Sequence, residues 1–359
     1  MKLRFLTAGE SHGKALVGII EGLPSGLALS EAPIKEQLLR RKQGRGRGNR
    51  QKIETDAVEI LSGVRKGKTI GSPIALIIQN LDYKNWGDVM SVEDRGEPER
   101  RRVEIPRPGH ADLVGKIKYK FDDMRDVLER ASARETAMRV ALGSVARVFL
   151  EACGVEVESR VVSIGGASGE DAVAAAIDAA RAAGDTLGGV FEVAAKGLPI
   201  GLGSYVQWDR RLEGPLSAAV MSLNAIKGVE IGLGFRAAEI PGSQAHDAYE
   251  PKGKTVGYRS NRSGGVDGGM TTGQPLVIRA AMKPLATLMK PLDSVDLKTM
   301  KAAKAHVERS DVSAVEAAAV ISESLVALAL ADAVLDKFGG DSMSEILPRL
   351  KQWEKDSSF

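Results

Sequence analysis

The chain has 359 residues, of which 43% are hydrophobic, so it is long enough and apolar enough to bury a sizeable core, and it is not a disordered protein. The 50 basic residues are nearly balanced by 47 acidic ones. The formal net charge of only +3 excludes a protein that attracts anions by its overall positive charge, so any anion must bind at a local basic site.

The cysteine count and the apolar segments indicate the compartment. Cys153 is the single cysteine, which excludes a disulfide framework and fits a reducing compartment, and its position in a predicted helix favours a buried structural thiol. The first residues, MKLRFLTAGESHG, lack the apolar core of a signal peptide. The most apolar late segment, 314–335, is interrupted by three acidic residues. We therefore expect a soluble cytoplasmic protein with no membrane partner.

Strands and helices alternate along the chain. Alternating or β-branched runs predict strands at 3–6, 15–21, 57–61, 73–79, 155–163, 189–195 and 276–281. Apolar residues at helical spacing predict helices at 33–42, 133–153, 170–183, 215–226 and 313–337. Ser132, followed three residues later by Glu135, predicts a capping box at the start of the second of these helices.

Short motifs recur in the same order in the two halves of the chain. A predicted strand followed by GLPSGL at 22–27 recurs as a strand followed by GLPIGL at 197–202, and each copy leads into a helix. The later pairs are VEI at 58–60 and 229–231, TIGSPI at 69–74 and TTGQPL at 271–276, and then a long alanine-rich helix in each half. The preserved order predicts two pseudo-symmetric β-α-β halves.

We expect these halves, about 1–153 and 154–340, to be fused into a single α/β domain over residues 1–359, with sheets packed against helices. Residues 341–359 are expected to form a C-terminal helical tail. Two long segments, 80–112 and 241–274, fit no regular element. Because irregular segments of this length inside a compact domain are usually functional, we expect the site to lie beside them.

Two of the four histidines, His12 and His110, lie in glycine-bounded loops, GESHG and RPGHAD. Glycine lets a backbone approach a ligand closely, and an imidazole exchanges a proton near neutral pH. A solvated loop histidine is the alternative for each of them. The chain has no HxxxH or HExxH spacing and no cysteine cluster, which argues against a metal site. A role as general acid or base therefore fits these histidines better than a role as metal ligands.

Arginines recur at predicted loop ends and helix starts. Guanidinium groups and helix N-termini both suit phosphate and carboxylate, so the set indicates a ligand with several negative charges, although each arginine alone could be a solvated surface residue. The set consists of Arg41, Arg45, Arg47, Arg107, Arg130, Arg134 and Arg309. The chain has neither a strand-GxGxxG-helix unit nor a GxxxxGK(S/T) loop, so those two kinds of nucleotide site are not predicted.

The basic stretch RRKQGRGRGNRQK, at 40–52, favours a different class of function, the binding of single-stranded RNA. Proteins of that class normally add aromatic side chains on which bases stack. No aromatic residue lies between Phe5 and Tyr83. The stretch therefore lacks such side chains, and we expect no nucleic-acid partner.

Eight chemically unusual motifs follow one another along the chain: GESHG (9–13), RPGHAD (107–112), RASARETAMR (130–139), NAIKGVEIG (224–232), SNRSGG (260–265), GGMTTGQP (268–275), AMKP (281–284) and HVERSD (306–311). In this order they resemble the chorismate synthase family over almost the whole chain. The extended segment 80–106 before RPGHAD resembles the longer bacterial form. No extra module that could act as a flavin reductase is present, so the chain resembles the monofunctional members.

The resemblance implies a lyase of the last step of the shikimate pathway. In that step 5-enolpyruvylshikimate-3-phosphate loses phosphate and a C6 hydrogen by 1,4-anti elimination and becomes chorismate. The family requires reduced FMN although the reaction is redox-neutral, and a monofunctional member needs an external source of reduced flavin. Members are usually homotetramers. The two carboxylates and the phosphate of this small-molecule substrate account for the arginine set.

The resemblance also implies roles for individual residues. His12 holds or takes a flavin proton, and His110, beside Arg107, is the general acid for the leaving phosphate. Asp311 lies near flavin N5, where it assists loss of the C6 proton. The implied FMN contacts are Arg130, Ala131, Ser132, Asn224, Ala225, Gly268, Lys283, Pro284, Leu285, Ala286, Thr287 and Arg309. No metal is implied.

The residues expected to bind substrate or NADP anions are Ser11, Arg41, Arg45, Arg47, Arg107 and Arg134. The family assigns to NADP the two arginines matched by Arg41 and Arg47, and binding of substrate stays open as the alternative. Ala131 stands where relatives have serine, and 283–287 lacks a serine found in some relatives, which leaves the backbone contacts in place. We interpret the stretch 40–52 as one wall of an anion pocket.

Overall fold

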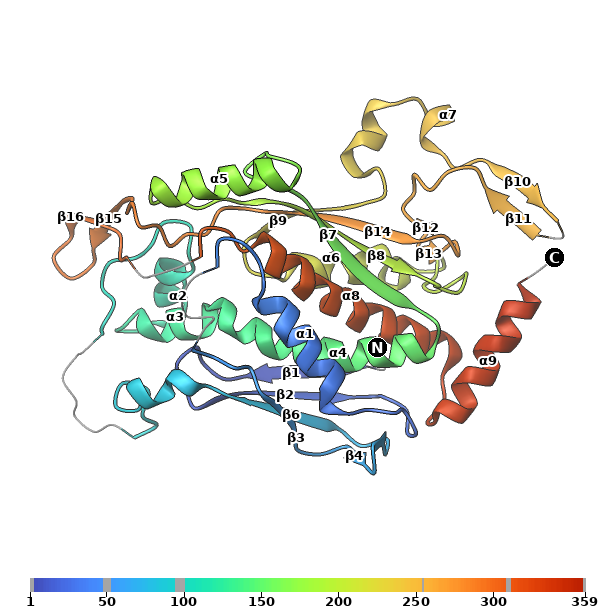
Figure 1. The fold of residues 1–359 in the computed structure, drawn as a ribbon, viewed down its shortest axis with the longest axis horizontal. Coiled ribbons are helices and arrows are strands. Elements are labelled where there is room, and N and C mark those ends of the chain that lie inside the picture. The colour runs from blue at the N-terminus through green and yellow to red at the C-terminus, as the bar shows by residue number, and fades with distance from the viewer. Residues whose placement is uncertain (1–2, 48–52, 94–100, 254, 308–310, 358–359) are drawn as a thin grey trace.

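Two four-stranded antiparallel sheets enclose a layer of helices in the computed structural model, which describes residues 3–47, 53–93, 101–253, 255–307 and 311–357 (Figure 1). The first sheet has the order β1-β2-β6-β3 and the second the order β7-β8-β14-β9. Their strands are β1 (Arg4–Ala8), β2 (Ala15–Glu21), β3 (Val58–Ile60), β6 (Ile74–Gln79), β7 (Glu156–Ile164), β8 (Gly189–Lys196), β9 (Ile226–Ile231) and β14 (Leu276–Met282).

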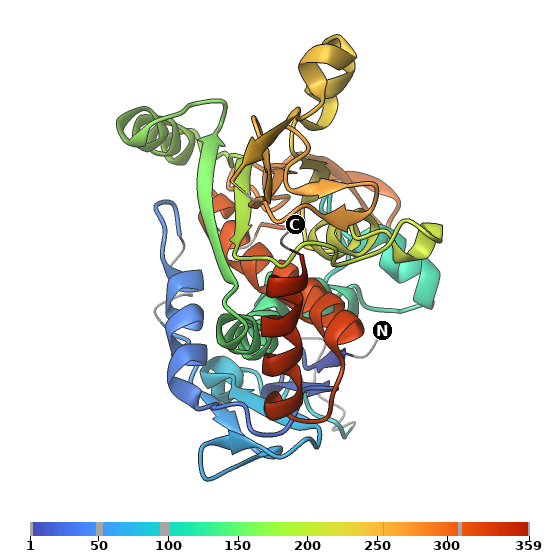
Figure 2. The same ribbon diagram turned by 90° about the vertical axis from the view of Figure 1, so that its right-hand side faces the viewer.

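The layer between the sheets holds the two longest helices, α4 (Thr136–Ala152) and α8 (Val315–Phe338), and two shorter ones, α1 (Glu31–Lys42) and α6 (Glu213–Met221). Figure 2, turned by 90°, shows α4 and α8 side by side in the middle of the molecule. Since α4 ends the first predicted half and α8 the second, this contact joins the two halves through one core.

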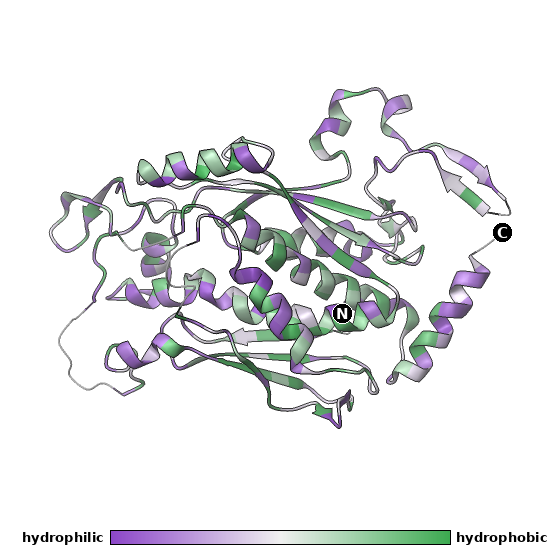
Figure 3. Cartoon of the chain, viewed as in Figure 1, coloured by the Kyte–Doolittle hydropathy of each residue, from purple (hydrophilic) through white to green (hydrophobic). Residues whose placement is uncertain are grey.

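Most of the surface of α4 and α8 is apolar, and this places them in the core. Met138, Leu142, Val145 and Phe149 of α4 are fully buried and fall on the predicted stripe. Cys153, at the end of α4, is also buried, and burial raises the pKa of its thiol to about 11. By length and composition alone α8 could cross a membrane, but 83% of its most apolar stretch is buried inside the fold. Figure 3 shows this concentration of apolar residues on α8 and a largely hydrophilic outer helix α9.

Shorter elements lie at the ends and surfaces of the sandwich. The remaining helices are α2 (Asp112–Tyr119), α3 (Arg125–Ala131), α5 (Glu170–Ala182), α7 (Gly242–Ala245) and α9 (Met343–Asp356), with 3-10 turns at Leu81–Asn85, Ala133–Glu135, Trp208–Arg210 and Gly234–Glu239. The strand pairs are β4 (Val64–Arg65) with β5 (Lys68–Thr69), β10 (Tyr249–Lys252) with β11 (Thr255–Tyr258), β12 (Val266–Asp267) with β13 (Met270–Thr271), and β15 (Asp293–Asp296) with β16 (Lys301–Lys304).

The two large sheets have the same connectivity. In each sheet the first two strands in chain order are paired, the fourth lies next to the second, and the third lies at the edge beyond it. Because β6 is antiparallel to both β2 and β3, the unit β2-α1-β3 is a split β-α-β arrangement. The unit β8-α6-β9 around β14 is its counterpart. The predicted α/β fold of two pseudo-symmetric β-α-β halves is confirmed.

Matching hydrogen bonds extend this symmetry to the repeated motifs. The hydroxyl of Thr69 donates to the carbonyl oxygen of Pro24 at 2.6 Å and accepts the backbone N–H of Leu27 at 3.0 Å. In the second half, the hydroxyl of Thr271 donates to a proline carbonyl at 2.6 Å and accepts a leucine N–H at 2.8 Å. Each threonine therefore fixes the turn that leads from a central strand towards a helix.

Thr69→Val and Thr271→Val are expected to lower the free energy of unfolding by similar amounts, about 1–3 kcal/mol each, because each leaves a buried carbonyl and a buried N–H unpaired. Urea unfolding followed by circular dichroism measures the loss. Thr255→Val, which removes an exposed hydroxyl bond within one hairpin, is the control and should change little. If only one of the two buried-threonine variants lost stability, the two threonines would not have equivalent structural roles.

The predicted helix 215–226 is shorter than expected at its C-terminal end. It is α6, which ends at Met221, and the chain then turns into β9 at Ile226. Ser222 caps the helix, and Ala225, four residues after Met221, has a φ of +67° in the turn before β9, a left-handed conformation that few residues other than glycine adopt. Nothing in the apolar spacing of the sequence indicates this turn.

The predicted capping box before the helix 133–153 does not form. A 3-10 turn at Ala133–Glu135 precedes α4, and Ser132 accepts the N–H of Arg134 at 3.3 Å. Glu135 pairs with Arg139 one helical turn later, at 2.8 Å. The 3-10 geometry shifts the capping contact by one residue.

The two segments predicted to be irregular contain short regular elements. The segment 241–274 holds α7 and the strand pairs β10-β11 and β12-β13. The segment 80–112 holds a 3-10 turn and reaches the start of α2, and its residues 94–100 lie outside the described part. Strands of two to four residues are too short to show an alternating pattern, which explains why they were not predicted.

We propose that residues 1–359 form one domain whose halves meet near residue 153. The shared core of α4 and α8 supports this division. The predicted helical tail contains α9, which contacts the repeated motif of each half: Met343 donates its N–H to Ser25 at 2.9 Å, and the indole of Trp353 donates to the carbonyl of Ile200 at 2.9 Å. The tail thus links the halves a second time.

Candidate active site

A cavity of about 660 Å³ lies beside the starts of α4 and α8, between the loop that follows β1 and the turn that follows α6. This volume is in the usual range for sites that bind small molecules. The predicted site residues that line it are Ser11, His12, Arg41, Arg47, Arg107, His110, Ala131, Ser132, Arg134, Asn224, Ala225, Lys283, Leu285, Ala286, Thr287 and Asp311. The structure therefore gathers residues from distant parts of the sequence around one space.

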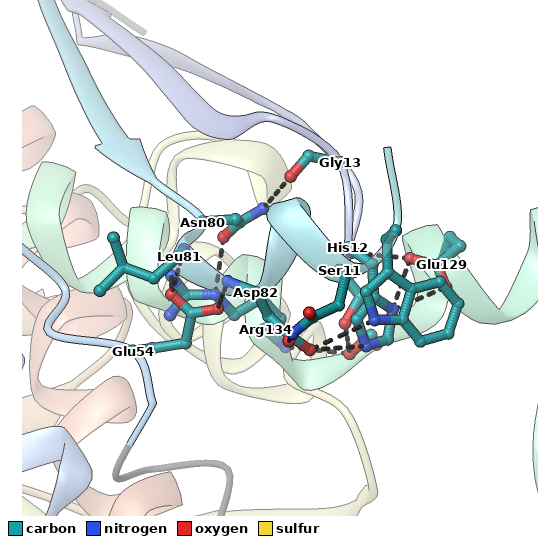
Figure 4. Close-up of polar contacts among 12 residues, drawn as sticks. Ser11, His12, Gly13, Glu54, Asn80, Leu81, Asp82, Glu129 and Arg134 are labelled. Carbon is teal, nitrogen blue, oxygen red and sulfur yellow. Dashed lines mark hydrogen bonds and ion pairs between the residues drawn. The ribbon is translucent and has the colours of Figure 1, made fainter. Parts of the chain in front are cut away.

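His12 is held by the buried carboxylate of Glu129 on α3. Its Nδ1 lies 2.8 Å from Oε1 of Glu129, and its backbone N–H donates to Oε2 at 2.8 Å (Figure 4). The carbonyl oxygen of Glu129 accepts the backbone N–H of Ser11 at 2.9 Å. The hydroxyl of Ser11 donates to that of Ser132 at 3.0 Å. The GESHG loop is thus fastened to α3 and to the start of α4.

An aromatic stack covers one face of His12. The ring of Trp86 lies 3.7 Å from the imidazole at an interplanar angle of 19°, and the guanidinium of Arg101 lies 3.8 Å from the indole ring. The indole N–H of Trp86 donates to Asp82 at 3.3 Å. Asp82 lies 4.0 Å from Nε2 of His12, too far for a hydrogen bond. Stacking and pairing therefore fix the plane of the imidazole.

A buried network of charged residues lies beneath the GESHG loop, as Figure 4 shows in part. Arg134 donates from Nε to Asn80 at 3.0 Å and from Nη1 to Asp56, and its Nη2 lies 3.4 Å from Glu54. Asn80 donates to the carbonyl oxygen of Gly13 at 2.8 Å. Arg134 lines the cavity, but these contacts use it mainly to support the loop that carries His12.

Arg41 is buried behind the start of α4. It donates to the hydroxyl of Thr136 at 3.0 Å and to the carbonyl of Ala133 at 3.0 Å, and Asp56 lies 3.5 Å away. Burial lowers the pKa of Arg41 to about 10, against the opposing effect of Asp56. A guanidinium with this pKa still carries its charge at neutral pH, so Arg41 gives the cavity wall a fixed positive charge.

His110, Asp112 and Arg107 form a second histidine–carboxylate group. Nδ1 of His110 lies 2.5 Å from Oδ1 of Asp112, which is fully buried. Arg107 grips the same carboxylate from Nε at 2.8 Å and from Nη2 at 3.0 Å. Its Nη1 donates to the hydroxyl of Thr287 at 3.0 Å. The RPGHAD loop is therefore held by one buried carboxylate.

The surroundings of Asp112 favour its charged form. Burial raises the pKa of this carboxyl, but hydrogen bonds from His110 and Arg107 and the charges of both outweigh burial and hold the pKa well below its usual range. A carboxylate accepts hydrogen bonds and donates none. Nδ1 of His110 therefore carries the hydrogen, and Nε2, which lies 3.4 Å from Nη2 of Arg107, is the nitrogen available to a ligand.

Arg47 and Asp311 meet on the cavity wall although they are far apart in the sequence. Arg47 donates from Nη1 to Asp311 at 2.6 Å, and both side chains are largely buried. Within the described residues, Nε of Arg47 is buried without a hydrogen-bond partner. The guanidinium therefore has a donor that a bound anion can use.

The rest of the described basic stretch bonds to other parts of the fold. Arg40 donates to both oxygens of the buried Glu323 at 2.6 and 2.8 Å. Arg45 is exposed and donates to Asp178 at 2.6 Å, so the structure does not place it at the cavity with Arg41 and Arg47. The predicted FMN contact Arg309 lies outside the described residues.

Three further predicted residues do not line the cavity. Arg130 lies near the end of α3, not at a helix start, and donates to the carbonyl oxygens of Thr7 and Gly9 at 3.0 and 2.9 Å. Gly268 lies in the turn between β12 and β13. Pro284 is bracketed by two lining residues, but it does not line the cavity itself.

Much of the cavity lining is apolar. Its apolar residues include Leu128, Leu223, Met282, Leu285, Ala314, Ala317, Ala318 and Ile321. Asn224 donates to the carbonyl of Ala131 at 3.1 Å, and its own Oδ1 is buried without a partner in the described part of the chain. Lys283 donates to the carbonyl of Gly109 at 2.6 Å. The cavity thus joins a cationic wall to an apolar wall that suits a flat ring.

The sequence did not reveal the groups that hold the two histidines. Asp112 lies two residues after His110 in RPGHAD, so that spacing was a usable signal. Glu129 directly precedes RASARETAMR but lies 117 residues from His12, and Trp86 lies in a segment predicted to be irregular. Over the described ranges, no group of three or more His, Cys, Asp or Glu residues is placed to hold a metal ion.

The chain is similar to chorismate synthases over nearly its whole length. Residues 3–335 match the family described as Chorismate synthase. The chain is 53% identical over 378 residues to the chorismate synthase of Geobacter sulfurreducens and 54% identical over 345 residues to that of Caldanaerobacter subterraneus subsp. tengcongensis, with 96% of both chains covered in each case. It matches a crystal structure of chorismate synthase with a TM-score of 0.79 at 40% identity, over 100% of this chain and 99% of that one.

Proposed function

This chain belongs to the chorismate synthase family, and we propose that the cavity described above is where it acts. It is a lyase of the last step of the shikimate pathway, and it converts 5-enolpyruvylshikimate-3-phosphate to chorismate and phosphate. The C6–H and C3–O bonds break, a double bond forms, and a proton and phosphate leave. The observation that carries the proposal is the pair of carboxylate-held histidines, His12 and His110, in one cavity with a cationic wall.

Reduced FMN is the proposed cofactor, and the residues present fit it. The apolar wall suits a flat ring, and the unpaired Nε of Arg47 and Oδ1 of Asn224 can bond polar groups of a ligand. The proposed holding residues are Ala131, Ser132, Asn224, Ala225 and the segment 283–287. When bound, reduced flavin supplies electron density to the substrate transiently and recovers it. A monofunctional enzyme takes it from an external source.

His110 is the proposed general acid for the leaving phosphate. Asp112 accepts the hydrogen on Nδ1, so the imidazole can carry a second hydrogen on Nε2 and donate it to a phosphate oxygen. Arg107 holds Asp112 from the other side and adds positive charge where phosphate charge develops. The three residues together favour departure of an anion.

His12 and Asp311 are proposed for the remaining proton movements. His12 holds or takes a proton of the bound flavin, and Ser11 beside it bonds the substrate or the imidazole. Asp311 assists loss of the C6 proton. In the free protein its carboxylate is paired with Arg47 at 2.6 Å, so an anionic substrate that attracts Arg47 competes for this pair.

An anaerobic assay with chemically or photochemically reduced FMN tests the proposed function. The purified protein and 5-enolpyruvylshikimate-3-phosphate should release phosphate, with a rise in chorismate absorbance. Reactions with oxidised FMN or without flavin should show no turnover. Lack of product with reduced FMN, in a protein whose circular dichroism is that of a folded chain, would contradict the proposal.

Arg47→Ala is expected to raise KM for the substrate by roughly 10- to 100-fold, because a charged hydrogen bond to an anion contributes about 1.5–3 kcal/mol. Steady-state kinetics with reduced FMN measures the change. The matched control is Arg45→Ala, since Arg45 belongs to the same stretch but bonds Asp178 outside the cavity. Equal effects of the two variants would contradict the assignment of substrate binding to Arg47. An effect of Arg47→Ala on NADP binding alone would favour the alternative of an NADP site at Arg41 and Arg47.

We also propose a homotetramer that works in the cytoplasm. The first sheet supports the assembly, because Leu6 of its edge strand β1, which is 71% exposed, is paired with the exposed Ile19 of β2 on the same face. Contiguous apolar surface of this kind is typical of protein–protein interfaces. Light scattering after size-exclusion chromatography measures the mass. A monomer at micromolar concentration would contradict the proposed assembly.

A further inference from the structure

We infer that Glu129 is a positioning residue that sets the tautomer of His12, with the hydrogen on Nδ1 and with Nε2 left for the ligand. The inference rests on the proposed function, in which His12 exchanges a proton with bound flavin. It adds a residue that touches neither flavin nor substrate, since Glu129 does not line the cavity. Its effect is therefore transmitted through His12.

The contacts between the two side chains leave one arrangement of the hydrogen. Oε1 and Oε2 of Glu129 lie 2.8 and 3.1 Å from Nδ1 of His12. A carboxylate only accepts, so a hydrogen on Nδ1 completes a hydrogen bond, whereas the other tautomer directs a lone pair at the negative oxygens. Asp82 lies 4.0 Å from Nε2, within ion-pair distance but beyond hydrogen-bond distance, so it accepts no hydrogen bond from Nε2.

Glu129 is itself fixed in place on several sides. It is 2% exposed, accepts the N–H of His12 at Oε2, and lies on α3 one turn after Arg125, whose Nη1 is 3.5 Å from Oε1. Trp86 stacks on the imidazole with the ring centroids 3.7 Å apart and limits rotation of the ring. The carboxylate therefore cannot reorient when His12 changes its tautomer, and it stabilises the tautomer with the hydrogen on Nδ1.

The same arrangement at His110 supports this reading. There the buried Asp112 accepts from Nδ1 at 2.5 Å, and Nε2, 3.4 Å from Nη2 of Arg107, is the nitrogen available to a ligand. The two carboxylates come from different elements, Glu129 from α3 and Asp112 from the first residue of α2. In both histidines of the cavity, Nδ1 is thus hydrogen-bonded to a buried carboxylate. Oriented histidines of this kind exchange protons from a defined atom.

Nitrogen NMR of protein labelled with ¹⁵N-histidine tests the inference without turnover. The four histidines give few signals, and the signal lost in His12→Asn identifies His12. At a pH where its imidazole is neutral, wild-type His12 should show a protonated Nδ1 and a free Nε2. In Glu129→Gln one carboxylate oxygen becomes an NH₂ group. The backbone N–H of His12, which donates to Oε2, keeps the remaining amide oxygen, so the NH₂ faces Nδ1 and the hydrogen should move to Nε2. With reduced FMN, kcat should fall by on the order of 10- to 100-fold, and KM should change little.

Two further variants complete the test. Glu129→Asp keeps a carboxylate and should restore the wild-type tautomer at least in part, together with part of kcat. Glu135→Gln, which neutralises another buried glutamate beside α4, should leave the His12 signals unchanged.

A wild-type His12 with its hydrogen on Nε2 would overturn the inference, even if Glu129→Gln does not fold. So would a loss of kcat in Glu129→Gln without a change of tautomer, which would indicate a merely structural role. Failure of the proposed function would instead appear as a wild-type protein without turnover.

Discussion

His110→Ala is expected to lower kcat by roughly 10²- to 10⁴-fold, because it removes the group that donates a proton to the leaving phosphate. Flavin affinity should change much less, since the holding residues proposed for FMN are others. The measurement is phosphate release under anaerobic conditions at saturating substrate and saturating reduced FMN. A separate fluorescence titration gives the dissociation constant of FMN.

The control for this variant is His246→Ala. His246 follows α7 in a protruding part of the second half and does not line the cavity. Its removal should leave kcat unchanged. If His110→Ala turns over at the wild-type rate, His110 is not the general acid, and the phosphate leaves without protonation from this residue.

Much of the fold could be predicted from the sequence because its main elements are long and regularly patterned. The strands at 15–21 and 276–281 and the helices at 133–153 and 313–337 have enough residues to reveal their period, and the repeated motifs reveal their relation. The elements that were missed are short or depend on a single backbone conformation. α6 stops at Met221 and the chain turns into β9 through the left-handed Ala225, and the spacing of apolar residues does not indicate this turn.

The candidate site could be predicted less completely, and sequence separation explains the difference. His12 and His110 stand out because glycines flank them, and the arginine set and the family resemblance named half of the other lining residues. The partners are harder to find: Glu129 meets His12 across 117 residues, and Arg47 meets Asp311 across 264. A charged residue on the surface and a charged residue with a buried partner cannot be told apart from the sequence. Arg45 and Arg47 illustrate this, since one faces Asp178 outside the cavity and the other lines it.

Asp112→Asn is expected to lower the free energy of unfolding at pH 7 by about 3–5 kcal/mol. The variant leaves the buried guanidinium of Arg107 without an anionic partner, and one neutral amide oxygen remains for the donors that share the two oxygens of Asp112. Urea unfolding monitored by circular dichroism measures the loss. Asp293→Asn is the matched control, because Asp293 is also ion-paired, with Lys304, but is exposed. Its stability should stay close to that of the wild type.

The stabilisation from Asp112 should depend on pH with a definite sign. The pKa of this carboxyl is lower in the folded chain than its ordinary value of 3.8, so the folded state binds the proton less tightly than the unfolded state. The contribution is therefore complete above about pH 4 and decreases as pH falls towards the folded pKa. The stability difference between wild type and Asp112→Asn should be constant near neutrality and shrink in acid. A difference that grows on acidification would contradict the assigned cause.

The effects of the Asp112 and His110 substitutions on kcat should be coupled. If Asp112 acts by orienting His110, then Asp112→Asn should lower kcat in the wild-type background but add little to His110→Ala, because residues that act as a unit are not additive. Losses that multiply in the double variant would mean that Asp112 acts through another group, and Arg107 is the one that shares its carboxylate. Arg107→Lys would separate these cases, since lysine keeps the positive charge but cannot grip both oxygens of Asp112. A kcat loss in Arg107→Lys that persists without His110 would assign the effect to the guanidinium.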